Sequence, residues 1–300
     1  MSDVRRGLAQ ARVHWRLALL VWALFLVLAA MAALPAWRWL DQLLGVAPEG
    51  DRLLEGLNLA LLRELFQYDR SLTPAIALGS IWTLAIVALL VNPFVAGGTL
   101  GVLLSHAPLE ARGDPTRAPG LTRQFVAHGM QFYWRFSRVL IVTGAIALLV
   151  GVSLVTLLSG LAEELRARGL ERPTLWVRDL RILVALVVIL LTSLIVDLAR
   201  IRIVREDDPR AWQPVREAIA FLRHRARACL GVTVAFLALM AAAALIYALV
   251  ASLVTPRSWV AIVLAIAWQQ AFAWTRTWLR VGMLAGLGSV VTLARDPRPV

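Results

Sequence analysis

The arginines of this chain are distributed unevenly among the polar connections between its apolar stretches. Six apolar stretches can be recognised: 17–35, 75–104, 137–159, 182–197, 228–253 and 258–294. Alternate polar regions (1–16, 105–138, 198–227 and 295–300) hold 19 Arg and 8 acidic residues, and the others (36–73, 160–181 and 254–257) hold 10 of each. Because cytoplasmic loops of membrane proteins carry the Lys/Arg excess, this pattern predicts six transmembrane helices with both termini in the cytoplasm.

The composition excludes an ordinary soluble domain. The chain is 60% hydrophobic with a net charge of +12 and a mean hydropathy of +0.73, and about 20 apolar residues suffice to cross a hydrocarbon core of roughly 30 Å. The excess charge lies in the predicted cytoplasmic loops and no nucleic-acid recognition motif accompanies it. We therefore expect the basic face to meet anionic headgroups of the lipid bilayer rather than nucleic acid. All 31 basic residues are Arg, which, with the abundance of Ala, Leu and Val, hints at a bacterial protein of the inner membrane.

The expected fold is an all-α, polytopic membrane helical bundle forming a single integral membrane domain over 1–300. Asp-Pro turns recur at Asp114, Asp208 and Asp296, 94 and 88 residues apart, and Asp-Pro favours turns and helix starts. The spacing suggests three helical hairpins built from repeat units of about 17–115, 121–209 and 215–297. The alternative is that basic turns simply recur at helix ends.

Three polar regions contain amphipathic segments. Apolar residues recur at helical spacing on one face of 121–136 and of 212–222, on the predicted cytoplasmic side, and of 50–66, on the outer side. Such helices lie in the membrane interface or pack on the protruding ends of the spans.

A few polar residues fall inside the apolar stretches, where charges are costly and are usually paired. They are Asn92, Asp197, Gln270, Arg276 and Arg280. Asn92, Asp197 and Arg276 each follow the start of their stretch by a similar number of residues, which places all three about 25 Å along the helix. We expect an intramembrane cluster in which Asp197 pairs with Arg276 or Arg280. The alternatives are a plain membrane boundary where Arg snorkels, and a functional polar site.

The second apolar stretch contains a predicted helix break. Pro93 follows Asn92, and Gly97, Gly98 and Gly101 come soon after. Broken helices at membrane depth are typical of transporter binding sites. The alternative is a proline kink with close helix packing through the glycines.

Catalytic and metal-binding patterns are missing from the sequence. The four His residues make no metal-ligand spacing, Cys229 is the single cysteine, and there is no nucleophile or phosphate-binding motif. We expect no enzyme activity, no cofactor and no metal.

A resemblance rests on the run from Asn92 to Gly98, the basic turn after it, and the later Asp197-Leu198-Ala199-Arg200, which precedes a second Arg-rich helix. In these features the chain resembles bacterial six-helix integral membrane proteins. More loosely, it is similar to the membrane domain that accompanies some glycerophosphodiester phosphodiesterases. The resemblance implies the fold and transfers no catalytic residue. The expected function is a non-enzymatic scaffold or accessory subunit with a membrane protein partner; the alternative is a transporter or lipid-handling protein that uses a polar site near Asn92 and Pro93.

Overall fold

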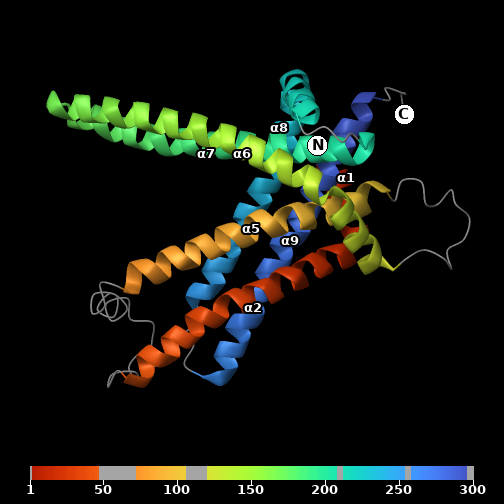
Figure 1. The fold of residues 1–300 in the computed structure, drawn as a ribbon, viewed down its shortest axis with the longest axis horizontal. Helices are drawn as coiled ribbons and strands as arrows, with labels where there is room; N and C mark the ends of the chain where they lie inside the picture. Colours follow the sequence, from red (N-terminus) through yellow and green to blue (C-terminus); the bar gives the residue numbers. More distant parts are fainter. Residues whose placement is uncertain (1, 47–71, 106–119, 208–211, 254–257, 296–300) are drawn as a thin grey trace, which may run out of the picture. The chain divides into compact units, whose positions relative to one another are not determined.

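The computed structural model describes residues 2–46, 72–105, 120–207, 212–253 and 258–295, and these residues are 97% helical. The described residues form seven helices (Figure 1): α1 (Ser2–Val13), α2 (Trp15–Val46), α5 (Leu72–Ser105), α6 (Leu121–Ala167), α7 (Glu171–Glu206), α8 (Trp212–Leu253) and α9 (Trp259–Arg295). The expected all-α class is therefore confirmed. The outer amphipathic segment 50–66 and the three Asp-Pro turns lie outside the described residues.

Several of these helices are long and apolar enough to cross a membrane. They are α6, residues Leu175–Glu206 of α7, and α8; α1 and α2 add a fourth candidate if their bent pair is one span. These helices indicate a membrane-embedded protein. The described residues do not confirm the count of six spans or the arrangement as three hairpins.

The chain divides into two compact units. The first contains Met1–Asn92 and Val234–Ala285, and the second contains Pro93–Thr233 and Gly286–Val300. Each unit combines segments from more than one of the proposed repeat units, and the repeat stays a prediction.

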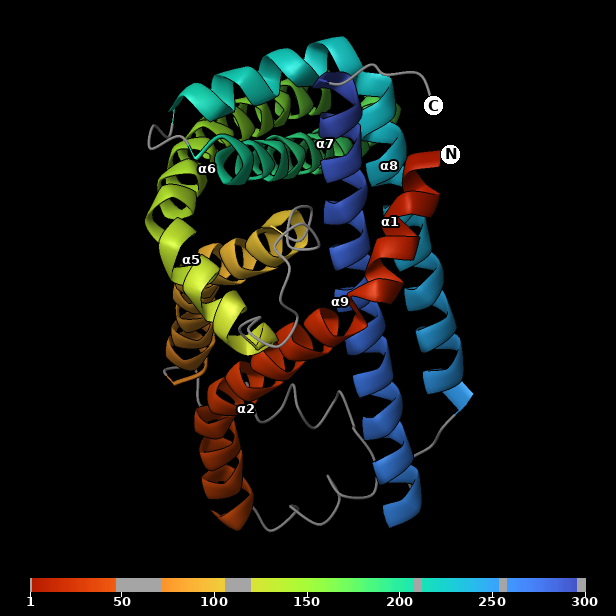
Figure 2. The ribbon, with the colours of Figure 1, turned by 90° about the vertical axis from the view of Figure 1, so that its right-hand side faces the viewer.

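In the first unit, the polar N-terminal region is itself a helix. α1 is amphipathic and meets α2 at an angle of 73° near His14 (Figure 2). Its concealed face contains Ala11, which is fully buried and whose carbonyl oxygen accepts a hydrogen bond from Nε1 of Trp278 on α9, 2.9 Å away. The polar region 1–16 therefore contains a helix, whose apolar residues recur at helical spacing and pack on another helix.

Also in the first unit, the apolar halves of α8 and α9 contact one another. The rings of Tyr247 and Phe272 stack with centroids 4.8 Å apart. Nε1 of Trp268 donates a 3.4 Å hydrogen bond to the carbonyl oxygen of Tyr247. These contacts connect the two halves as consecutive, packed helices.

In the second unit, α6 and α7 lie side by side in both views (Figures 1 and 2). The turn between them contains Gly169 with φ of 77°, a left-handed conformation that glycine adopts without steric cost. α6 runs without interruption from the amphipathic segment 121–136 into the apolar stretch 137–159. The two are therefore not separate helices: no proline separates them, and the helical hydrogen bonding continues across their junction.

α8 differs from α6 in this respect. Arg225 has non-helical backbone angles, φ −122° and ψ 28°, and the helix is kinked there (Figure 2). The kink separates the amphipathic segment 212–224 from the apolar remainder of the helix.

Burial is concentrated at one end of each long helix. In α9 every residue of 281–288 is buried, whereas Trp259, Val263 and Leu264 are 82%, 60% and 60% exposed. In α7 all of 196–201 is buried, while Ile189 is 65% exposed. The protein core is therefore built from helix segments next to the Arg-rich connections, and the more distant apolar segments present their side chains outward.

Candidate functional site

The predicted polar residues have different surroundings. Asp197 is almost fully buried in α7, at 2% exposure. Asn92 of α5 and Arg276 of α9 are exposed, and Gln270 and Arg280 of α9 are half-buried. Asp197 belongs to the second unit and the other four belong to the first, so the expected cluster stays a prediction.

Asp197 has a buried neighbour of opposite charge on its own helix. Arg200 is 3% exposed and follows Asp197 by three residues, which places the two side chains on one face of α7. The Arg200 guanidinium lies 5.5 Å from the centre of the Phe136 ring on α6, within range of a cation–π interaction. Arg200 is not a member of the polar cluster predicted from the sequence, although its spacing from Asp197 was a usable signal.

The glycines of α5 lie against the amphipathic first half of α6. A Cβ atom on Gly98 would come within 2.7 Å of the Phe125 ring, and one on Gly101 would overlap the His128 side chain. A Cβ on Gly97 would meet the backbone of His128 at 3.3 Å. From the other side, Gly129 of α6 accommodates the Phe94 ring of α5. Small residues here allow two helices to approach closely.

Pro93 precedes these glycines without interrupting the helix. α5 continues through Pro93 as one helix, so the expected break is not a break in helical structure. A proline inside a helix removes one backbone hydrogen bond and can be accommodated with a kink. The boundary between the two compact units falls between Asn92 and Pro93.

Several arginines of the second unit connect helices to one another. Arg202 of α7 forms a 2.5 Å salt bridge with Glu217 of α8, and Arg135 of α6 forms one of the same length with Asp207. Arg205 of α7 hydrogen-bonds to the hydroxyl of Thr292 on α9. These basic side chains thus have structural partners within the chain, in addition to any contact with lipid.

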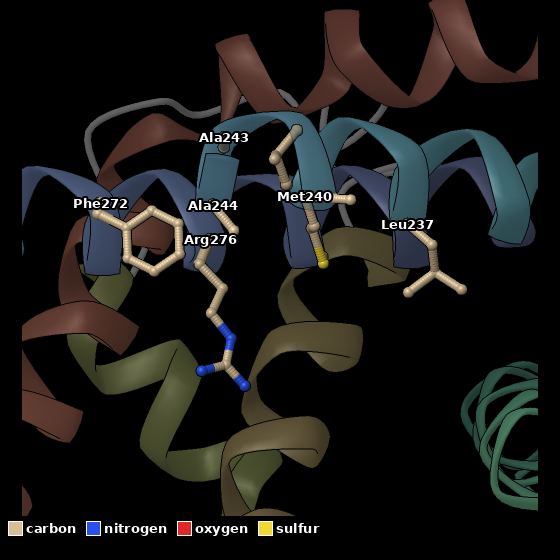
Figure 3. A pocket seen from close by; sticks show the side chains of 8 residues that line it. Leu237, Met240, Ala243, Ala244, Phe272 and Arg276 are labelled. Atoms are coloured by element: carbon tan, nitrogen blue, oxygen red, sulfur yellow. The ribbon is translucent and has the colours of Figure 1, made fainter. Parts of the chain in front are cut away.

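A cavity of about 350 Å³ lies along α8 and α9 in the first unit (Figure 3). Its walls are Leu237 and Met240 with three alanines of α8, and Phe272, Arg276 and Leu279 of α9. Figure 3 shows Arg276 extending its guanidinium from α9 on the same side of the helices as Leu237 and the sulfur of Met240. Arg276 supplies the only charged group of this lining.

The helices around the cavity carry no negative charge of their own. Residues 234–253 of α8 and 259–285 of α9 contain no Asp or Glu, whereas α9 contains both Arg276 and Arg280. Among the described residues, no hydrogen bond or ion pair engages the Arg276 guanidinium. A cationic group in apolar surroundings requires water or an anion as its neighbour, and the adjoining helix segments do not supply the anion.

Metal-binding groups do not come together in the part of the chain that the structure describes: no three His, Cys, Asp or Glu side chains are placed to hold one ion. The site with the clearest chemistry is therefore the α8–α9 cavity, which combines apolar walls with one guanidinium.

Comparison of the chain with protein-family models, with curated proteins and with solved structures found no match.

Proposed function

We propose that this chain is a multi-pass protein of the bacterial inner membrane, with six spans supplied by α2, α5, α6, α7, α8 and α9 and with both termini in the cytoplasm. The Arg excess of alternate polar regions and the length and apolar character of α6, α7 and α8 support this. The test is site-specific labelling of single-cysteine variants in intact cells, with Cys229 replaced by serine. Cysteines introduced at Ser2 and Val300 should react only with a membrane-permeant reagent, and reaction with an impermeant one would overturn the orientation.

We propose further that the protein acts as a non-enzymatic scaffold or accessory subunit of a membrane assembly. The supporting observation is the contrast along its helices. The most apolar windows of α6 and α8 have only 11% and 6% of their residues buried. The Arg-rich ends are joined by salt bridges such as Arg202–Glu217. Such a chain has an ordered core of its own and leaves long apolar surfaces for neighbours in the membrane.

A photo-crosslinking amino acid in α6 tests the scaffold role. At Leu157, which is 71% exposed, irradiation of cells should give a crosslink to one defined membrane protein. The matched control is Val139 of the same helix, which is fully buried and should give none. If Leu157 crosslinks only to lipid, the scaffold proposal fails for this surface.

Lipid handling is the second candidate function, and the α8–α9 cavity favours it. Apolar walls and one cationic group suit an amphiphile better than a polar solute. The transporter alternative depended on a break at Asn92 and Pro93, and α5 continues through both residues as one helix.

A further inference from the structure

We propose that the α8–α9 cavity binds one membrane lipid with an anionic phosphate headgroup, the phosphate pairing with Arg276 and an acyl chain lying along the apolar walls. The proposal rests on the lipid-handling function and the membrane placement proposed above, and it does not depend on the scaffold role. It rests on the composition of the cavity, on the charge of the helices that form it and on the position of Arg276 along α9.

The chemistry of the lining selects an amphiphile. Leu237, Met240 and Phe272 offer apolar side chains, and three alanines of α8 leave room between them. A volume of about 350 Å³ matches part of an acyl chain rather than a whole lipid. The ligand would therefore lie partly in the cavity and partly in the surrounding bilayer.

Charge selects an anionic ligand over a neutral one. Arg276 and Arg280 lie one helical turn apart, and residues 259–285 of α9 and 234–253 of α8 contain no acidic residue. A guanidinium offers paired N–H donors that match two phosphate oxygens. An anionic phosphate therefore satisfies the charge of Arg276, for which these helix segments supply no acidic partner.

The position of Arg276 matches the position of lipid phosphates. Arg276 follows Trp259 by a distance of about 25 Å along the helix. Trp259 is 82% exposed, as expected for an aromatic residue at one membrane interface. With a hydrocarbon core of roughly 30 Å, Arg276 is close to the opposite interface, where the phosphates lie. An acyl chain attached to that phosphate would run back along the apolar walls toward the middle of the bilayer.

The experiment is native mass spectrometry of the full-length protein purified in a mild detergent and exchanged into equal amounts of phosphatidylglycerol and phosphatidylcholine. The wild type should retain one phosphatidylglycerol per chain. Arg276→Gln should lower the retained fraction about tenfold, as expected for loss of one charge-assisted bidentate contact. The matched control is Arg168→Gln, which removes an exposed arginine that pairs locally with Glu164; it should retain the lipid.

A second variant tests the apolar part of the site without changing charge. Ala244→Phe places a large ring in the cavity and should displace the lipid while Arg276 is intact. Circular dichroism and thermal unfolding of each variant identify any that has lost its fold, and binding is then compared only among folded variants.

Three results would overturn the proposal. They are equal retention of phosphatidylcholine, unchanged retention in Arg276→Gln, and a co-purifying protein that crosslinks to position 244 in place of lipid. The last would assign the cavity to a partner helix.

Discussion

The indole Nε1 of Trp278 donates a hydrogen bond to the carbonyl oxygen of Ala11, 2.9 Å away, and so joins the last helix of the chain to the first. Ala11 lies in the final turn of α1, where carbonyl groups have no partner within their own helix. The backbone N–H of His14 satisfies the carbonyl of Gln10, and Trp278 satisfies the next. A side chain of α9 thereby caps the C-terminal end of α1 by satisfying one of its carbonyl groups.

Trp278→Phe should loosen α1 from α9. The phenyl ring keeps most of the apolar packing and removes the N–H donor, so the expected loss is about 1 kcal/mol, the typical contribution of one hydrogen bond. Hydrogen–deuterium exchange of residues 2–13 should become faster. Trp259→Phe, at an exposed position, is the control and should leave that exchange unchanged. Equal protection of α1 in both variants would contradict the structural role of this bond.

Gly98→Ala and Gly101→Ala should each destabilise the protein, because the new methyl group would meet the side chain of Phe125 or His128. Overpacking of this kind typically costs about 1–3 kcal/mol. Gly144→Ala in α6 is the matched control, since a Cβ there meets nothing within 4 Å. It should be neutral or stabilising by about 0.5–1 kcal/mol, because alanine favours the helix over glycine. Thermal unfolding in detergent measures the stability of all three variants. Wild-type stability in Gly98→Ala would contradict the close approach of α5 to α6 at this position.

The salt bridge between Arg202 and Glu217 should contribute more than the one between Arg135 and Asp207. The first pair has side chains that are 18% and 37% exposed, whereas Asp207 of the second is 67% exposed. Double-mutant cycles with glutamine and asparagine replacements should give about 1 kcal/mol of coupling for the first pair and below about 0.5 kcal/mol for the second. High salt should reduce the coupling energy of the more exposed Arg135–Asp207 pair more than that of the Arg202–Glu217 pair. Equal coupling energies would mean that the difference in burial has no effect here.

Asp197→Ala should lower thermal stability and yield. The side chain is buried, and removal of one partner of a buried charged pair costs about 3–5 kcal/mol. Double-mutant cycles with Arg280, and with Arg200 one turn away on α7, identify the partner as the arginine whose loss no longer adds to that of Asp197. Wild-type stability in Asp197→Ala would refute the pairing.

Helical character was predictable because it depends on local periodicity. The apolar stretches are long enough for helices and the faces of 121–136 and 212–222 repeat at helical spacing; all of these residues except Ser258 are helical in the structure. The continuity of α6 was not predictable, because an amphipathic stretch followed by an apolar stretch is compatible with one long helix or with two separate helices. The kink of α8 at Arg225 was not predictable either, because that position is neither a proline nor a glycine.

The candidate site was predictable only in part. The presence of Arg276 inside an apolar stretch marked it from the sequence as a residue in need of an anion. The cavity beside it depends on which face of α8 packs against α9. That face could not be predicted, because alanines occur on every side of this part of α8. Arg202 and Arg205 were counted only as loop charges, because their contacts with Glu217 and Thr292 connect distant parts of the chain.

α6 has a mechanical consequence. Its 47 residues rise about 70 Å as one unbroken helix, more than twice the thickness of a hydrocarbon core. Its helical structure continues from the segment that packs against α5 into the apolar segment beyond it. We therefore expect a displacement of the segment beside α5 to move the apolar segment of α6 as well, whereas α8 has non-helical backbone at Arg225 between its two segments.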